Sequence, residues 1–197
     1  MGLILALLAA VVGPLWTAPD LRSVADRAHA WTVHVTARGA DETVTASGVI
    51  IRGGLVLTDL HGLLSKQPDG TIAPAEIVVD VAGVGALPAV LAGADVALGI
   101  AVLLLPDAAR DLPGADIARS DPDIADPLLA MGSDGKVVDV LGVKVDHVDR
   151  LRLHTTGALP PGFRGGPLFD AHGNLAALEL PTGAAAASSV LRLLNQN

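Results

Sequence analysis

Short apolar runs, separated by glycine, proline and charged residues, make up most of this chain. Through residues 31–36 apolar and polar side chains alternate, which is typical of a strand with one buried face. The uninterrupted apolar run Ile100–Leu105 ends at Pro106 and predicts a strand buried on both faces. Similar patterns predict further strands at residues 43–51, 55–57, 76–81 and 86–91.

The second half of the chain repeats this arrangement after a change in composition. Residues 107–126 are rich in aspartate and proline, and we interpret them as a linker. Two short helices are predicted, one over residues 20–30 and one near the end of the chain, where Ser188 is expected to be the N-cap. Strands are predicted beyond the linker at residues 128–131, 137–148, 151–155, 168–169 and 175–180.

Roughly six strands on each side of a linker predict an all-β fold of two packed six-stranded antiparallel barrels. A short C-terminal helix completes it. The expected divisions are 1–19, an N-terminal apolar segment acting as signal peptide or membrane anchor; 20–106, the first helix and first barrel; 107–126, the linker; and 127–197, the second barrel and last helix.

The N-terminal segment carries no charged side chain before Asp20. Its apolar run Leu3–Val12 has the length of a signal-peptide core, although no Lys or Arg precedes it. Residues 1–18 approach the lower limit for a membrane span and are a possible tether. The sequence therefore predicts export to the periplasm or the extracellular space, or anchoring in a membrane, with a buried N-terminal helix as the alternative.

Composition excludes several classes of function. The chain has 197 residues, of which 51% are hydrophobic and only 17% charged, so it is long and apolar enough to bury a core. A net charge of −8 argues against a nucleic-acid partner. The absence of cysteine excludes disulfides and thiol nucleophiles. Neither metal-ligand spacing of histidines nor a nucleotide-binding loop occurs, so no metal and no cofactor is expected.

Three segments carry a family resemblance. They are Ser47–Ile51 with Gly54–His61, then Gly99–Leu105, and finally Pro161–Asp170 followed by His172–Leu175. In this order they resemble the trypsin-like serine proteases, and most of all the HtrA-type branch. The resemblance implies that His61 stands where the catalytic histidine would be. It implies a nucleophile loop whose oxyanion-binding part is represented by Gly162, Phe163, Gly165 and Gly166.

The resemblance also implies that two catalytic groups are missing. Arg164 stands in place of the nucleophilic serine, and Gly99 in place of the aspartate. In a competing register Asp95 would supply the acid. A guanidinium is always protonated and offers only donors, so Arg164 cannot attack a carbonyl. We expect Arg164 to face solvent or to pair with a carboxylate, and the loop glycines to allow positive φ.

These departures predict a catalytically inactive homologue in which His61 is vestigial. Its expected role is that of a scaffold or regulator that binds a protein or peptide. The alternative is an active serine endopeptidase that uses His61 with Asp95 and a non-standard nucleophile. Ser47, Ser65 and Ser133 are the candidates for that nucleophile. A purely structural role is a third interpretation that the sequence does not separate from the first.

Overall fold

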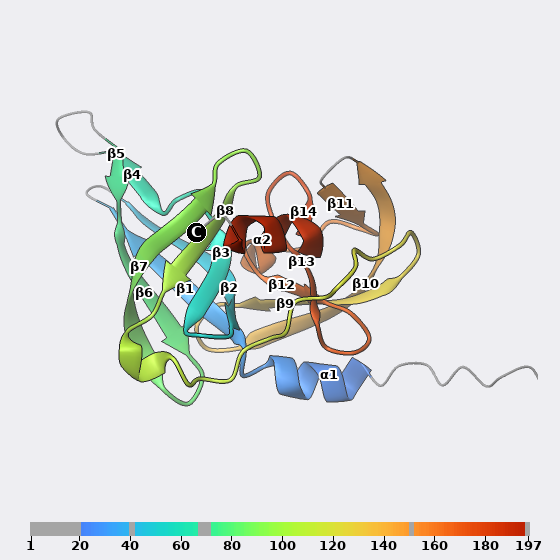
Figure 1. The fold of residues 1–197 in the computed structure, drawn as a ribbon, viewed down its shortest axis with the longest axis horizontal. Helices are drawn as coiled ribbons and strands as arrows, with labels where there is room; N and C mark the ends of the chain where they lie inside the picture. The colour runs from blue at the N-terminus through green and yellow to red at the C-terminus, as the bar shows by residue number, and fades with distance from the viewer. Residues whose placement is uncertain (1–20, 40–41, 67–71, 150–151, 196–197) are drawn as a thin grey trace, which may run out of the picture.

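The computed structural model describes residues 21–39, 42–66, 72–149 and 152–195. It confirms an all-β fold of two closed six-stranded antiparallel barrels that lie side by side (Figure 1). The first barrel has the strand order β1-β2-β3-β8-β7-β6. Its strands are β1 (Thr32–Arg38), β2 (Thr43–Ile51), β3 (Leu55–Asp59), β6 (Glu76–Val81), β7 (Gly85–Asp95) and β8 (Ile100–Leu104).

The second barrel has the order β10-β11-β14-β13-β12-β9. The long strand β10 pairs with β9 through its first half and with β11 through its second half, so it spans two faces of the barrel. The strands of this barrel are β9 (Pro127–Ser133), β10 (Val138–Asp149), β11 (Arg152–Thr155), β12 (Pro167–Phe169), β13 (Leu175–Leu178) and β14 (Ala184–Ala186).

Two strands were not predicted. β4 (Leu64–Lys66) and β5 (Ile72–Pro74) form a separate two-stranded sheet beside the first barrel. Strand β7 is also longer than predicted, because it continues to Asp95, which pairs with Ile100 of β8. In β4, in β5 and at the end of β7, apolar and polar residues do not alternate over several positions. The sequence pattern therefore did not predict strands there.

The apolar core lies in three places. One cluster fills each barrel, and a third lies between them. The third combines Leu57 of the first barrel with Met131 and Phe169 of the second, all fully buried. Both helices contribute to it: α1 (Leu21–Ala28) through Val24, and α2 (Ala187–Leu194) through Val190. The two barrels therefore share one core and form one packed unit.

Residues 1–20, including the apolar segment, lie outside the described residues. Within the part of the chain that is described, no helix has both the length and the apolar character that a membrane crossing requires.

The acidic segment between the barrels is packed against both of them. Its Ala115 is buried, and the Ala115 N–H donates to the Ile50 carbonyl of the first barrel at 2.9 Å. Leu175 of the second barrel donates to the Asp116 carbonyl at 2.7 Å. Within it, the short 3-10 helix η1 (Asp107–Ala109) follows Pro106. These backbone bonds hold the connection along the outside of the inter-barrel core.

The cap of the last helix differs from the prediction. Helix α2 begins at Ala187, and its N-cap Ala186 provides no side-chain hydrogen bond. Ser188 lies inside the first turn instead, and its N–H and hydroxyl donate to the Asp121 carboxylate at 2.8 and 2.7 Å. A carboxylate 67 residues earlier thus satisfies an N–H of the first turn, a partner that local sequence cannot reveal.

A buried serine connects the two barrels. The Ser47 hydroxyl on β2 accepts a hydrogen bond from the Ser133 N–H at 2.7 Å and donates to the Gly162 carbonyl at 2.7 Å. The side chain is fully buried. Both partners belong to the second barrel, so this hydroxyl fixes the position of one barrel against the other and supports the loop that follows Gly162.

We predict that Ser47→Ala lowers the free energy of unfolding by about 2 to 6 kcal/mol. The substitution leaves one buried N–H and one carbonyl without a partner, each at about 1 to 3 kcal/mol. Thr43→Ala, at an exposed position on the same strand, is the matched control and should change stability by less than about 0.5 kcal/mol. Urea titration followed by fluorescence measures both. Equal effects would contradict the bridging role of Ser47.

Candidate active site

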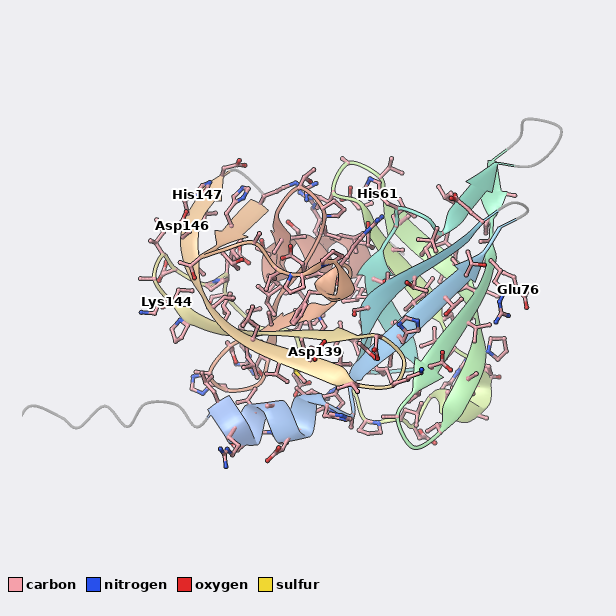
Figure 2. All side chains as sticks on the ribbon, turned by 180° about the vertical axis from the view of Figure 1, so that it is seen from behind. His61, Glu76, Asp139, Lys144, Asp146 and His147 are labelled. Carbon is pink, nitrogen blue, oxygen red and sulfur yellow. The ribbon has the colours of Figure 1, made fainter. Side chains whose placement is uncertain are left out.

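His61 lies where the two barrels join (Figure 2). Arg164, on the second barrel, reaches it with a hydrogen bond. His61 lies in the turn that follows β3, and Arg164 directly follows the 3-10 helix η2 (Pro161–Phe163). The Arg164 Nη2 donates to the His61 carbonyl at 3.0 Å. The structure therefore brings together the two residues that the resemblance predicts in the histidine and serine positions.

A buried carboxylate lies between them. Asp59, the last residue of β3, has a side chain with no exposed surface. One of its oxygens accepts hydrogen bonds from the His61 ring Nδ1 at 2.7 Å and from the His61 N–H at 3.0 Å. The other oxygen accepts from the Arg164 Nε. Each carboxylate oxygen is thus bonded to a donor, as a fully buried charge requires.

Arg164 pairs with a carboxylate, as expected, and its side chain is about one-third exposed. The negative charge of Asp59 and the positive charge of Arg164 compensate each other at the barrel junction. A carboxylate oxygen can only accept, so the His61 Nδ1 donates its proton to one Asp59 oxygen. In this tautomer of a neutral imidazole, the Nε2 atom carries the free lone pair of the ring. An oriented imidazole is present, and the residue beside it is a cation.

Gly99 lies directly against the imidazole. A Cβ built on Gly99 would be 2.9 Å from the His61 Cε1 and 3.2 Å from its Nδ1. Gly99 also has φ of +79° and accepts the Leu60 N–H at 2.8 Å. Position 99 is therefore next to the ring but carries no side chain, and its backbone conformation disfavours any residue except glycine.

Asp95 is directed to other partners. It ends β7, and residues 96–99 form the turn that leads into β8. Its carboxylate accepts the Leu98 N–H at 3.0 Å and lies 3.6 Å from the Arg192 guanidinium of α2. The carboxylate that contacts His61 belongs to Asp59, which sequence reasoning missed. The available signal was a lone acid that ends an apolar strand two residues before the histidine.

The loop glycines have different roles. Only Gly165 has positive φ, at +77°, so the expectation that the loop glycines serve this purpose is wrong for Gly162 and Gly166. A Cβ on Gly166 would collide with the Met131 carbonyl, so that glycine allows close contact of two backbones. A Cβ on Gly162 would meet no atom within 4 Å. Phe163 is buried in the core of the second barrel.

The amide of Arg164 is already bonded within its loop. Its N–H donates to the Pro161 carbonyl at 3.2 Å, closing the turn of η2. In serine peptidases the N–H of the nucleophile position is one of the donors that stabilise the oxyanion. Here that donor points to a carbonyl of its own loop, so an oxyanion would have to displace this bond.

Of the serines proposed as replacement nucleophiles, two have side chains that the structure describes. The Ser47 hydroxyl is bonded to Gly162 and Ser133, and the Ser133 hydroxyl accepts the Gly135 N–H at 3.2 Å. The structure does not describe the side chain of Ser65. Among described residues, no hydroxyl is hydrogen-bonded to the His61 ring, and no group of three or more His, Asp or Glu side chains is placed to hold a metal ion.

Two cavities flank Arg164. One, of about 380 Å³, lies between the barrels and is lined by His34, Thr45, Ala46, Ser133, Asp134, Pro161, Gly162 and Arg164. The other, of about 390 Å³, lies within the second barrel's loops. Its lining includes Glu179, whose pKa is raised to about 7 because burial disfavours the charged carboxylate. Glu179 was also missed from the sequence, although it is the only acid in the apolar run 175–180.

Comparison with models of known protein families shows which family this chain belongs to. The model of the trypsin-like peptidase domain matches residues 46–178, which is more than half of the sequence and includes both His61 and Arg164. The chain belongs to the trypsin-like peptidase family. A search of curated proteins gives no match.

Solved structures show the same trypsin-like peptidase fold. The crystal structure of Deg5 has a TM-score of 0.74 and 19% identity, and covers 87% of this chain and 90% of its own. The serine endoprotease from Yersinia pestis has a TM-score of 0.72 and 24% identity, over 89% and 65% of the two chains. The Rv3671c protease from M. tuberculosis, in its active form, has a TM-score of 0.72 and 16% identity, over 87% and 82%.

We predict that Asp59 and Arg164 are energetically coupled. Arg164→Met leaves the Asp59 carboxylate buried without a cation, and adding Asp59→Asn to that variant should recover stability. A double-mutant cycle, measured by urea unfolding, should give a coupling of about 1 to 3 kcal/mol. The control is the exposed pair Arg52–Asp116, whose coupling should stay below about 1 kcal/mol. A coupling no larger than this control would contradict the pairing.

We predict opposite outcomes for alanine at two loop glycines. Gly165→Ala should lower the free energy of unfolding by at least roughly 1 to 3 kcal/mol, because positive φ strains an L residue. The added Cβ would also meet the Ser47 carbonyl, the Thr58 hydroxyl and the Asp59 N–H. Gly162→Ala has open space and ordinary φ, so it should cost less than about 0.5 kcal/mol. Thermal unfolding of both variants tests this.

Proposed function

We propose that this chain is a catalytically inactive member of the trypsin-like peptidase family that binds a protein or peptide as a scaffold or regulator. One observation carries the proposal. The residue in the nucleophile position is Arg164, and its guanidinium is bonded to Asp59, which in turn holds His61.

The chemistry of acyl transfer needs a hydroxyl or thiol beside the imidazole. Arg164 offers neither, because a guanidinium carries only hydrogen-bond donors. Its backbone N–H, which would be an oxyanion donor in an active peptidase, donates to the Pro161 carbonyl instead. In subtilisin, which uses the same chemistry, loss of the serine alone lowers turnover by a factor on the order of 10⁶. These facts support a role other than peptide cleavage.

The binding role is supported by the two cavities beside Arg164. The one between the barrels has walls from β1 and β2 on one side and from the end of β9 and η2 on the other. Concave sites between two packed units are common places for ligands. The rigid shared core keeps these walls in place, so the surface is preformed for a bound segment. The identity of the protein or peptide partner stays a prediction.

The alternative is an active endopeptidase, and one observation keeps it open. The Asp59 carboxylate lies 2.7 Å from the His61 Nδ1, so the ring is oriented as a general base would be. This alternative needs a nucleophile from outside the described contacts of His61. The location that the apolar residues 1–18 predict, exported or membrane-anchored, also stays a prediction and applies to both roles.

We predict that the purified protein does not react with a fluorophosphonate probe and does not hydrolyse a casein substrate. The reason is the absence of a nucleophile beside the oriented imidazole among the described residues. Gel fluorescence measures labelling, and release of dye from labelled casein measures turnover. Labelling or turnover that His61→Ala abolishes would overturn the proposal.

A converse variant makes this test sharper. Arg164→Ser alone places a hydroxyl in the nucleophile position and keeps the Asp59–His61 contact. We expect weak labelling that His61→Ala removes. Adding Gly99→Asp is not expected to help, because the new side chain would strain a positive φ and press against the His61 ring.

A further inference from the structure

Strand β10 has an open edge along its first half. Residues 138–144 pair with β9 on one side, and pairing with β11 on the other side begins only at Val145. In Figure 2, β10 runs across the front of the second barrel, from Asp139 near the first barrel to Lys144 on the side away from it. The first half of this strand therefore has a neighbour on one side only.

The backbone bonds of β10 show which groups point to the open edge. In an antiparallel sheet the N–H and C=O of one residue point to the same side, and successive residues alternate between the two sides. The Val145 N–H donates at 3.0 Å to Asp126, which directly precedes β9. The Lys144 carbonyl accepts the Thr156 N–H from the β11 side at 2.8 Å. Three earlier residues share the direction of Lys144 and so point to the open edge: Val138, Val140 and Gly142.

Within the described part of the chain, the N–H and C=O groups of Val138, Val140 and Gly142 have no hydrogen-bond partner. Such an edge is a template for a further strand, and proteins commonly protect it with lysine, proline or a covering segment. Residues 137–143 contain neither lysine nor proline, and Asp139 is their only charged residue. The edge therefore has little of the usual protection against pairing.

The side chains along this edge are apolar and exposed. Val137, Val140 and Leu141 are 58%, 44% and 41% exposed, although all three are large and apolar. A Cβ on Gly142 would meet no atom within 4 Å, so the surface is open at that position. A second strand on this edge would bury apolar surface in addition to pairing the backbone.

We propose that the open edge of β10 pairs with the same edge of a second copy of this chain, forming a symmetric dimer. The two strands run antiparallel about a two-fold axis at Val140. Val140 then lies opposite Val140 of the second copy, and Val138 lies opposite Gly142 of the second copy. Every unpaired backbone group of the open stretch gains a partner, because each of these residues meets one that also points to the edge.

The bonds already present in the chain favour this register. An axis at Leu141 would pair Val140 with Gly142 but place Val138 opposite Lys144, whose N–H and C=O are bonded within the chain. The axis at Val140 leaves no group of the open stretch unpaired. It also brings the Val138 side chain to the open surface at Gly142 of the second copy.

Two-fold symmetry favours a second copy over an unrelated extended segment. A bound peptide would cover the edge of β10 but expose a new edge of its own. In the symmetric pair each open edge covers the other, so the assembly is closed at two copies.

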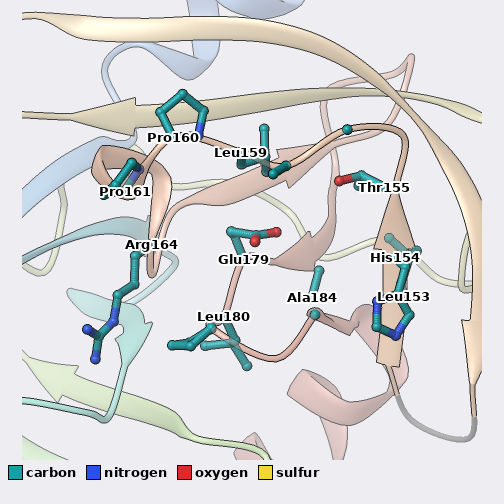
Figure 3. Close-up of a pocket in the computed structure, with 14 residues that line it drawn as sticks. Leu153, His154, Thr155, Leu159, Pro160, Pro161, Arg164, Glu179, Leu180 and Ala184 are labelled. Carbon is teal, nitrogen blue, oxygen red and sulfur yellow. The ribbon is translucent and has the colours of Figure 1, made fainter.

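The interface is separate from the surface proposed for peptide binding. Among the described residues, none that belongs to β10 lines the cavity around Glu179 (Figure 3) or the cavity between the barrels. The dimer would therefore carry two copies of each cavity. The proposal does not depend on the peptide-binding role, and its failure would leave that role unaffected.

Net charge opposes the dimer and predicts its response to salt. Each copy carries a charge of −8, so two copies repel each other at low ionic strength. Salt screens this repulsion without weakening backbone or apolar contacts. The dimer should therefore become tighter between about 50 and 500 mM NaCl. A dimer that dissociates on addition of salt would contradict the proposed interface.

The first experiment compares the full chain with Val140→Pro by sedimentation velocity. Proline removes an N–H that the dimer needs and that pairing with β9 does not use, and it is tolerated on open strand edges. The parent chain should show a monomer–dimer equilibrium, and Val140→Pro should raise the dissociation constant at least about tenfold. An unchanged far-ultraviolet circular dichroism spectrum shows that the variant folds. A parent chain that stays monomeric up to about 0.5 mM overturns the proposal.

A second pair of variants keeps the N–H in place. Val140→Lys would set two ammonium groups opposite each other across the two-fold axis, which disfavours pairing. Val90→Lys is the matched control, the same change at a 62% exposed valine of β7 on the first barrel. We expect the dissociation constant to rise at least about tenfold for Val140→Lys and less than about twofold for Val90→Lys. Equal effects would exclude the β10 edge as the interface.

The third experiment tests the register with cysteine, which the chain lacks. Opposed residues of a bonded antiparallel pair have Cα atoms about 5.5 Å apart, within the range that a disulfide spans. Under mild oxidation Val140→Cys should give a covalent dimer, whereas Val138→Cys should do so only when mixed with Gly142→Cys. Equal cross-linking of Val90→Cys would show random collision and count against the register.

A synthetic peptide of residues 136–144 distinguishes a second copy from other partners of the edge. The peptide offers the same backbone groups, so it should convert the dimer to a monomer, while a peptide of the same residues in scrambled order should not. Binding of the peptide to a chain that is monomeric throughout would assign the edge to a different extended segment and overturn the dimer.

Discussion

The Asp59 carboxylate is the group on which the organisation of this site depends. It is fully buried, its charge is compensated by Arg164 on the opposite barrel, and its other oxygen accepts hydrogen bonds from His61 in the turn after β3. A buried charge with a missing partner would destabilise the fold, so an arginine in this loop requires an acid within reach, and the acid requires the arginine. The pair explains how a long cationic side chain is accommodated at a position where the resemblance predicts a small hydroxyl.

The loop around Arg164 has kept its shape for structural reasons. Gly165 and Gly166 allow the loop backbone to pass close to both barrels, and the Gly162 carbonyl is bonded to the buried Ser47 hydroxyl. The carbonyl of Arg164 also accepts the Ser47 N–H at 2.7 Å. These contacts connect the two barrels, so the sequence of the loop can persist under selection for stability without any selection for cleavage.

Much of the fold could be predicted from the sequence, because each barrel strand is short, apolar and bounded by turn residues. The motifs around His61, Gly99 and Arg164 predicted that these residues lie together, and they do. Their assignment to catalytic positions stays a prediction. Asp59 and Glu179 were missed: each is a lone acid in an apolar run, but the pairing of Asp59 with Arg164 and the burial of Glu179 depend on residues far away in the sequence. The same is true of the bond from Ser188 to Asp121, because a partner 67 residues away leaves no local signature.

Asp59 belongs to the first barrel and Arg164 to the second, so their ion pair also connects the two barrels. A bound segment that moves the barrels apart would have to break the Asp59–Arg164 ion pair. A segment that binds on the surface of both barrels would leave this ion pair intact. Since the His61 ring is hydrogen-bonded to the same carboxylate, breaking this ion pair would change the electrostatic environment of the imidazole. The environment of the His61 imidazole therefore reports on the separation of the two barrels.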